Sequence, residues 1–558
     1  MKKTVCLLLA ALLLAGCAAN VPAERDPAES YTVPDQFFGT MDQDASLPVE
    51  YVSRFEKEVV ISLTEDGITV DGGGETETVF TSRDILYYEN RETYESGNPY
   101  GDGDSADMHT AEEASAHTVV NITAPGAYRV TGTLTAGQIR VDLGQDAREN
   151  HEAVVELILE DADITCTVAP AILFLNTYEC DGSWSVDTAT PDVDTSAAGA
   201  NLILEGSNTV SGAYVAKIYK DQEGEKKLWK QDGAIYAYQS LNVFGPGSLD
   251  LTASNEGLDS ELHLTINGGN IAIRSDNDGI NTNEDGVSVT TINGGNLHII
   301  AGLGEEGDGI DSNGYLVING GTVVASANPA ADAGLDSDMG SYVNGGIVVA
   351  MGSAMDWAET DSAQVTLNLQ FAQYQSQDCA IVVSDPEGKA IFAYDPGEDE
   401  ILGRHSRRYM GMILSCPGFA QGDSYYVFTD GVLSGEESSG IYSAVAGYEK
   451  GIQMAYTGTD VMMRPGMGGF KGEPPRMPEG ETMPADFDPE NFTVPEGMEM
   501  PQMPEGGFKG EPPKDGFGKE MPQGEFGGFG PAEPDGERKV LFYMQDKVNF
   551  FSGLTAVQ

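Results

Sequence analysis

The pattern of apolar and polar positions repeats four times between Glu256 and Gly352. Each copy contains a β-branched residue followed by Asn-Gly-Gly, at Ile266–Gly269, Ile292–Gly295, Ile318–Gly321 and Val343–Gly346. After each tetrad the apolar residues alternate with other residues, as in Ile271 and Ile273, Leu297 and Ile299, Val323 and Ala325, and Val348 and Ala350. Alternation with a period of two predicts β-strands rather than helices.

The tetrads begin 26, 26 and 25 residues apart, and a fixed period in this range indicates a repeat architecture. Glycine pairs interrupt every apolar run, and each glycine inside a helix would cost about 1 kcal/mol. We therefore predict an all-β fold, a right-handed parallel β-helix with one repeat per coil, in which coils stack about 4.8 Å apart. A small antiparallel β unit and a disordered Met/Pro/Gly-rich tail are expected to follow it.

Stacked coils would align equivalent residues in rows. One row of aliphatic residues is expected to point inward and fill the core: Leu258, Ile280, Ile310 and Leu335. The tetrad asparagines are expected to form a side-chain ladder with a structural role: Asn267, Asn293, Asn319 and Asn344.

Acidic residues form two further rows, the first with Glu256, Asp278 and Asp308 and the second with Asp259, Asn281, Asp311 and Asp336. Carboxylates about 4.8 Å apart repel by about 3.5 kcal/mol at an effective dielectric constant of about 20. Arg274 is the one basic residue between Gln231 and Gly388, so a cation is expected to offset this repulsion. Calcium is the predicted ion, with Asp259, Asp276, Asp278, Asp285, Asp308, Asp311 and Asp336 as candidate ligands. The alternative is a solvated acidic edge that discourages association between molecules.

The remaining sequence predicts five further segments around the β-helix, which is assigned to residues 58–355. Residues 1–17 have the features of a lipoprotein signal peptide, and proline and acidic residues in 18–57 indicate a tether. Short apolar runs separated by turn residues predict an antiparallel β cap at 360–460. The low-complexity composition of 461–538 predicts disorder, and strand character returns at 539–558.

The amino-terminal segment resembles a bacterial lipobox. Lys2 and Lys3 precede a short apolar run that ends in Leu14-Ala15-Gly16-Cys17. The resemblance implies cleavage before Cys17 and lipid attachment to its sulfur, which would hold the protein at the extracellular face of the membrane. An ordinary secretory signal peptide is the alternative.

The composition limits the partners of the protein. The formal net charge of −59 excludes nucleic acid and bare anionic membranes as direct partners.

An exported protein can form disulfides, and of the three possible connectivities we favour the two local pairs, Cys166 with Cys180 and Cys379 with Cys416. We expect a monomer.

Several segments resemble a family of bacterial cell-surface carbohydrate-binding β-helix lipoproteins that is similar in fold to pectate lyases. The resemblance is carried by Pro125–Asp142, Leu202–Asn208, Asp232–Tyr236 and the Asn-Gly-Gly repeats. It implies a right-handed parallel β-helix, calcium ions at the acidic turns and affinity for plant cell-wall polysaccharide, including acidic pectic sugars. Ala333 departs from the pattern by replacing the acid before Gly334, which puts one metal position in doubt.

Aromatic residues cluster between Ala213 and Gln239. Aromatic faces stack on sugar rings, so Tyr236, Tyr238 and Trp229 are candidate carbohydrate-binding residues. The alternative is a loop packed on the flank of the β-helix.

The sequence favours non-catalytic, calcium-dependent binding of an extracellular polysaccharide. One alternative is a polysaccharide lyase of the pectate-lyase type, which would need a Lys or Arg base near the metal. Another is a surface adhesin or structural stalk in which calcium only holds the fold together.

Overall fold

The computed structural model describes residues 39–40, 51–64, 67–88, 107–182, 185–216, 230–377, 379–398, 407–449, 451–460 and 537–557. All of them belong to one compact unit, formed by Met1–Met467 together with Pro534–Gln558. A second unit, Gly468–Glu533, lies outside the described residues, as do Cys17 and nearly all of the expected disordered segment at 461–538.

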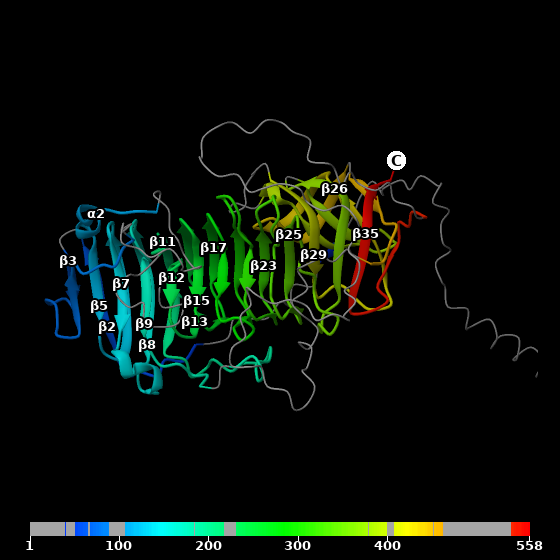
Figure 1. Cartoon of the computed structure of the whole chain (residues 1–558). Helices are drawn as coiled ribbons and strands as arrows, with labels where there is room; N and C mark the ends of the chain where they lie inside the picture. Colours follow the sequence, from blue (N-terminus) through cyan, green and yellow to red (C-terminus); the bar gives the residue numbers. More distant parts are fainter. Residues whose placement is uncertain are drawn as a thin grey trace, which may run out of the picture. The chain divides into compact units, whose positions relative to one another are not determined.

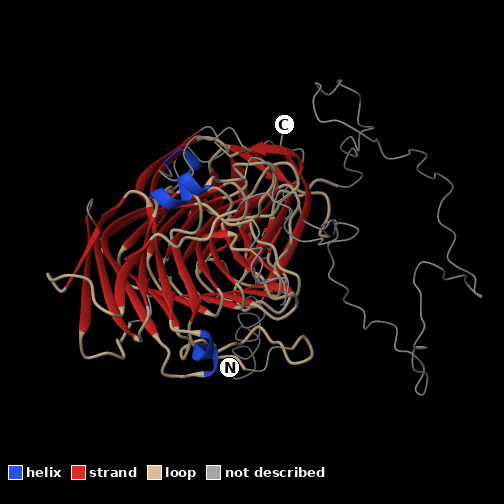
Figure 2. Ribbon diagram, turned by 60° about the vertical axis from the view of Figure 1, so that its left-hand side comes forward, coloured by secondary structure: helices blue, strands red, loops and turns tan. Residues whose placement is uncertain are grey.

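The regular secondary structure of the described residues is almost entirely β-strand, which confirms the all-β prediction (Figure 2). The helices among them are α2 (Ala111–Ala116) and the short 3-10 turns η1 (Gln145–Glu149) and η3 (Pro396–Glu398). Thr110 and Glu113 form a capping box at the start of α2. Within the described part of the chain, no helix is long and apolar enough to cross a membrane.

Successive segments add parallel strands to three ladders, and the strands follow one another along the molecule in chain order (Figure 1). The first ladder contains β6 (Gly126–Leu134), β8 (Val155–Cys166), β10 (Ala200–Glu205), β13 (Leu241–Phe244), β16 (His263–Ile266), β19 (Val289–Ile292), β22 (Tyr315–Ile318) and β24 (Gly340–Val343). The second contains the end of β8, β11 (Ser207–Gly212), β14 (Ser248–Ala253), β17 (Asn270–Ser275), β20 (Asn296–Ile300), β23 (Thr322–Ser326) and β25 (Ile347–Gly352). The third contains β5 (Thr118–Ile122), β7 (Gly137–Asp142), β9 (Ile172–Asn176), β12 (Gly233–Ala237), β15 (Glu256–Ser260), β18 (Ile280–Thr282) and β21 (Ile310–Ser312).

Each Asn-Gly-Gly tetrad lies at the corner between a strand of the first ladder and the next strand of the second. The second glycine of each tetrad has a positive φ, +100° at Gly269, +90° at Gly295, +80° at Gly321 and +83° at Gly346. Only glycine adopts this backbone conformation without strain, which explains the repeated residue.

The expected asparagine ladder is confirmed at this corner. The Nδ2 of Asn293 donates to the Oδ1 of Asn267 at 2.9 Å. The same bond joins Asn319 to Asn293 at 3.0 Å and Asn344 to Asn319 at 3.1 Å.

The expected inward row is also confirmed. Leu258 is paired with Ile280 and Ile280 with Ile310, and an isolated bridge continues the row to Leu335. All four side chains are 0% exposed and belong to one continuous hydrophobic core.

Replacing Leu258 with alanine should lower the free energy of unfolding by about 2–5 kcal/mol, because it leaves a cavity between stacked strands. Chemical denaturation of the purified protein measures this change. Val432→Ala is the matched control, since Val432 is 59% exposed and its truncation should cost less than about 0.5 kcal/mol. Equal effects of the two substitutions would contradict the assigned core.

Strands beyond β25 pair mostly antiparallel. They are β26 (Thr366–Ser376), β27 (Ile381–Ser384), β28 (Ala390–Tyr394), β29 (Arg408–Ser415), β30 (Ser424–Thr429), β31 (Val432–Ser438), β32 (Ile441–Glu449), β33 (Ile452–Ala455), β34 (Phe542–Tyr543) and β35 (Val548–Ala556). β25 and β26 both pair with β29, and β35 lies parallel to β26 (Figure 1). The last strand of the second ladder is therefore covered by a paired strand.

Strands near the amino terminus likewise pair with the first strands of the ladders. β2 (Glu58–Thr64) extends the first ladder by pairing with β6, β3 (Gly67–Val70) folds back on β2, and β4 (Val79–Ser82) pairs antiparallel with β5. Within the segment expected to be a tether, β1 (Gly39–Thr40) pairs with β32, and the ring of Tyr51 lies 4.7 Å from that of Phe244.

The structure forms neither of the expected disulfides among Cys166, Cys180, Cys379 and Cys416. Each thiol has separate neighbours: Cys166 lies near the backbone of Val168, and Cys180 lies beside Glu179 and Ser240. Burial raises the pKa of Cys166 to about 11 and that of Cys416 to about 12, so neither is a reactive thiolate at neutral pH.

Candidate metal centre

The acidic residues lie at the start of the third-ladder strands, and the backbone fixes their stacking. The N–H of Gly257 donates to the carbonyl oxygen of Asp278 at 3.0 Å, and the N–H of Gly279 donates to that of Asp308 at 3.0 Å. Asp259 is paired with Asn281, which is paired with Asp311. Both acidic rows therefore have the register expected from the repeat.

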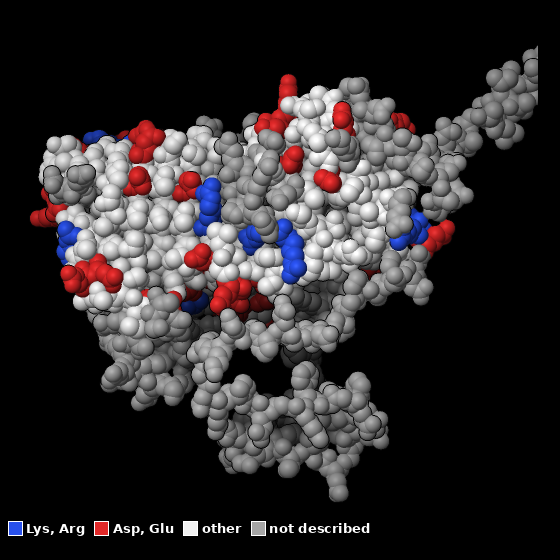
Figure 3. Space-filling view, turned by 90° about the horizontal axis from the view of Figure 1, so that it is seen from above, with Lys and Arg blue, Asp and Glu red and all other residues white. Residues whose placement is uncertain are grey.

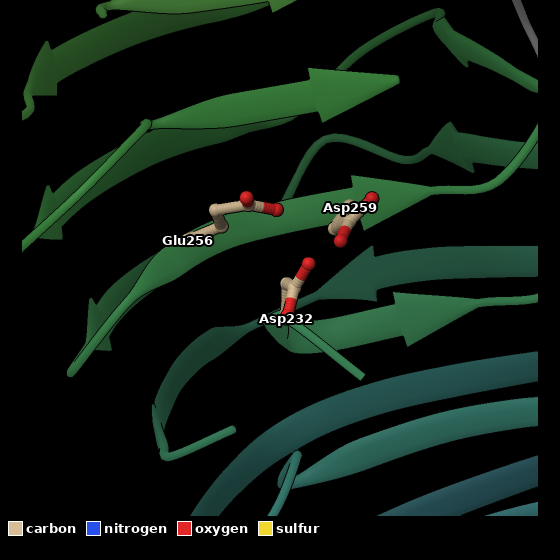
Figure 4. Close-up of side chains that lie close together, drawn as sticks. All are labelled: Asp232, Glu256 and Asp259. Carbon is tan, nitrogen blue, oxygen red and sulfur yellow. The ribbon is translucent and has the colours of Figure 1, made fainter. Parts of the chain in front are cut away.

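Among the described residues, one group of three carboxylates has an oxygen of each within 4.8 Å of the other two, and it comprises Asp232, Glu256 and Asp259. Figure 4 shows the side chains of Glu256 and Asp259 on β15 and that of Asp232, just before β12, close together. Asp232 is 6% exposed, Glu256 4% and Asp259 0%. We refer to these three residues as the inner cluster.

The hydrogen bonds of the inner cluster are incomplete. Asn283 donates from Nδ2 to the Oδ1 of Asp259 at 2.7 Å. Among the described residues, no donor reaches the buried Oδ2 of Asp259, the Oε2 of Glu256 or the Oδ1 of the adjacent Asn281. Unsatisfied buried oxygens are costly, so the cluster would be stabilised by a bound cation or, without one, by a proton shared between Asp259 and Glu256.

These oxygens fit a calcium ion. Calcium takes six to eight oxygen ligands at about 2.3–2.6 Å, which places opposed ligand oxygens about 5 Å apart. The separations in the inner cluster lie within this limit. Among the described residues, Asp232, Glu256 and Asp259 could therefore hold the ion, and Asn281 is paired with Asp259 on the adjacent strand.

The row continues from the inner cluster to Asp278, Asp308 and Asp311, and Asp278 is 8% exposed whereas Asp308 and Asp311 are only partly buried. We refer to Asp308, Asp311 and the partly buried Asp336 as the outer cluster. Burial and the neighbouring charge of Asp336 raise the pKa of both Asp308 and Asp311 to about 8. Burial and the charge of Glu256 also raise the pKa of Asp278 well above its usual range.

The inner end of the row is too buried to be the solvated acidic edge considered as the alternative. Side chains there are at most 8% exposed. Seen from above in Figure 3, the described surface has scattered acidic and basic groups separated by wide uncharged areas.

One basic residue does reach the inner cluster, which corrects the expectation that the acids have no protein partner. Lys230, one residue before the acidic region, forms an ion pair with Asp232. Burial lowers the pKa of its amine, but the charges of Asp232 and Glu256 raise it more, so the net shift is upward. The lysine therefore remains protonated and adds one positive charge against three carboxylates.

Two further described arginines near the row, Arg274 and Arg407, bond to other groups. Arg274 is bonded to Asp250 at 2.6 Å on the second ladder. Arg407 donates to the carbonyl oxygens of Ala301 and Ala327, each at 2.6 Å. The contact of Arg407 with the stacked strands is therefore with backbone carbonyls rather than with carboxylates.

The candidate ligands predicted from the sequence fall into two groups. Asp259, Asp278, Asp308, Asp311 and Asp336 lie along the row, whereas the side chains of Asp276 and Asp285 are exposed outside it. Asp285 instead accepts a hydrogen bond from Asn313 at 3.1 Å.

Sequence reasoning missed Asp232 as a ligand. The signal was present, because Asp232-Gly233-Ala234-Ile235 is the acid-glycine-aliphatic phrase of the later repeats with one inserted residue. The insertion shifts the register, so that Gly233 pairs with Glu256.

The candidate sugar-binding tyrosines are buried. Tyr236 is 0% exposed and donates its hydroxyl to Glu261, and Tyr238 is 5% exposed and packs edge-on against Tyr236. Neither ring offers the exposed face that stacking on a sugar requires, and both instead contribute to the burial of the neighbouring carboxylates. Trp229 lies outside the described residues.

The raised pKa values predict how stability depends on pH when no divalent cation is present. Unfolded aspartate has a pKa of about 3.9, so between pH 4 and 8 the folded state holds more protons at Asp308 and Asp311 than the unfolded state does. Stability should therefore fall as the pH rises through this window. Melting curves in chelator at pH 5 and pH 8.5 measure the effect, and Asp308→Asn/Asp311→Asn should flatten it. An equally steep fall in that variant would contradict the assignment.

Comparison with known proteins points to carbohydrate binding. A curated carbohydrate-binding domain-containing protein of Acetivibrio thermocellus is 28% identical over 157 residues, which are 28% of this chain and 45% of that protein. The chain thus spans less than half the length of this relative. A solved polysaccharide lyase-like protein from C. thermocellum, a gadolinium derivative, aligns with 52% of this chain and 93% of its own at 21% identity and a TM-score of 0.31. Residues 116–378, which contain the whole acidic row, match the family described as carbohydrate-binding domain-containing proteins.

Proposed function

We propose that the protein is a non-catalytic, calcium-dependent receptor for extracellular polysaccharide, anchored through lipid on Cys17 at the outer face of the membrane. We further infer that the three ladders are the faces of a right-handed parallel β-helix, an inference supported by their parallel register. The observation that carries the function is the row of buried, under-bonded carboxylates inside the region that matches a carbohydrate-binding domain.

The two ends of the row are suited to different tasks. The inner cluster is closed to solvent, so its oxygens can hold an ion but cannot touch a polysaccharide. The outer cluster is only partly buried, so its carboxylates remain accessible from solvent. We assign stability to the inner cluster and recognition to the outer one.

An acidic glycan is the preferred ligand class for the outer cluster. Calcium, when bound, supplies the positive charge that lets carboxylates of the protein and of a uronate share one site. Asp308 and Asp311 would hold the ion, while their backbone hydrogen bonds to neighbouring strands keep them in place. Without the ion, two polyanions would repel each other.

The lyase alternative requires a base next to the metal. Lys230 lies at the inner cluster, but its ammonium group is ion-paired with Asp232, and the carboxylates of this cluster are closed to solvent. A protonated amine cannot accept the proton that elimination removes. This geometry favours binding over catalysis.

An array of neutral and acidic plant cell-wall glycans, probed with the mature chain with and without chelator, tests the proposed function. We expect binding to uronate-containing glycans that chelator removes and that added calcium restores. Absence of binding to every glycan would contradict the proposed function and favour a structural stalk. Shortening of uronate chains during incubation would favour the lyase.

A further inference from the structure

A groove of about 640 Å³ runs along the outer face of the first ladder, away from the acidic row of the third. Its floor is one row of outward-facing residues in register: Asn242, Thr265, Thr291, Val317 and Tyr342. One wall is formed by the asparagine ladder and another by the segment from Pro191 to Ser196.

Another segment of the protein covers the earlier residues of this row. Asn201 and Glu156 precede Asn242 in the same register. Ser53 donates to the Oε2 of Glu156 at 2.5 Å, and the backbone N–H of Arg54 donates to its Oε1 at 2.8 Å.

The segment from Pro191 to Ser196, which forms the second wall, covers the next residues of the row. The hydroxyl of Thr195 lies 2.7 Å from the Oδ1 of Asn242 and 2.7 Å from the Oγ1 of Thr265. Extended polar segments thus bind the first half of the row through hydroxyl and amide groups. From Thr265 to Tyr342 the row borders the groove.

The groove has the hydrogen-bonding groups of a sugar site. Asn319 and Asn344 are exposed, and the ladder uses one of the two N–H donors of each side-chain amide. Tyr342 adds a partly exposed aromatic ring at one end, and Phe244 adds one at the other. Rings combined with amides and hydroxyls suit a ligand with apolar faces and many hydroxyl groups.

The negative charge of the groove favours uncharged ligands over acidic ones. The groove is lined by Asp192, Asp194 and Asp361, and no lysine or arginine lines it among the described residues. A uronate chain would meet like charges there. An uncharged glycan would meet none.

We propose that this groove binds a linear, uncharged polysaccharide chain lying along the row, at a site separate from the calcium-dependent outer cluster. The proposal rests on the proposed function, because it takes carbohydrate binding as given and adds a second ligand class. Tyr342 contributes stacking, and the floor at Thr291 requires a small side chain.

Calorimetric titration of neutral β-linked hexasaccharides of glucose, xylose and mannose into the mature chain, in chelator, tests the site. We expect the wild-type protein to bind at least one of them. Tyr342→Ala, which removes the ring, and Thr291→Arg, which fills the floor, should each lower the affinity about tenfold or more. Tyr543→Ala is the matched control, since Tyr543 is 52% exposed on β34 and does not line the groove.

The possible outcomes distinguish failure of the groove proposal from failure of the proposed function. Folding of the variants is checked by their melting temperatures and by calcium-dependent binding of oligogalacturonate, which both should retain. Wild-type protein that binds oligogalacturonate but no neutral hexasaccharide would overturn the groove alone, as would folded variants with unchanged affinity. Absence of binding to any glycan would overturn the proposed function as well.

Discussion

Adding calcium should raise the melting temperature of the wild-type protein by a few degrees, and chelator should reverse the rise. An ion that binds only the folded state adds about 2.7 kcal/mol at a hundredfold excess over its dissociation constant. The physical reason is the inner cluster, where buried carboxylate oxygens lie within 4.8 Å of one another. Differential scanning calorimetry with and without millimolar calcium measures the shift.

The double variant Glu256→Gln/Asp259→Asn should lose most of this rise, because it removes two charged ligands and keeps the shape of both side chains. In chelator the variant should melt at or above the wild-type temperature, because buried repulsion has been removed. The double variant Asp276→Asn/Asp285→Asn is the matched control, since it neutralises two exposed aspartates outside the row. An unchanged wild-type melting temperature on calcium addition would refute calcium binding at the inner cluster.

The second large effect concerns recognition. Asp308→Asn/Asp311→Asn should lower the calcium-dependent affinity for oligogalacturonate at least about tenfold, because the outer cluster loses two charged ligands. The fold should survive, since Asn281 already occupies the position between Asp259 and Asp311 in the same row. Binding assays at saturating calcium measure the loss.

This variant should still gain thermal stability from calcium, because its inner cluster is intact. Asp276→Asn/Asp285→Asn again serves as the control and should bind oligogalacturonate as the wild-type protein does. Full affinity in the outer-cluster variant would show that these aspartates do not bridge to the glycan.

Repetition made part of this structure predictable. Because the Asn-Gly-Gly tetrads recur at a nearly constant spacing, residues at equivalent positions had to become neighbours, as Asn293 and Asn267 do. The same reasoning predicted that Leu258 pairs with Ile280 and that Asp259 pairs with Asn281, as they do. Side-chain direction followed from strand alternation.

Features outside the regular repeat could not be predicted in this way. Burial of Tyr236 depends on Leu173 and Tyr238, and Leu173 lies in an earlier, less regular segment. The pairing of Lys230 with Asp232 arises just before the first clear repeat. The spacing of the cysteines suggested two local disulfides, but the structure forms neither.

The most direct test of the account is a titration of oligogalacturonate into the wild-type protein at a series of fixed calcium concentrations, with the reciprocal calcium titration at fixed oligogalacturonate. The account predicts that affinity for the glycan rises with calcium to a plateau and that the glycan raises calcium affinity by the same factor, because binding linkage is reciprocal. Equal affinity for oligogalacturonate in chelator and in saturating calcium would contradict it.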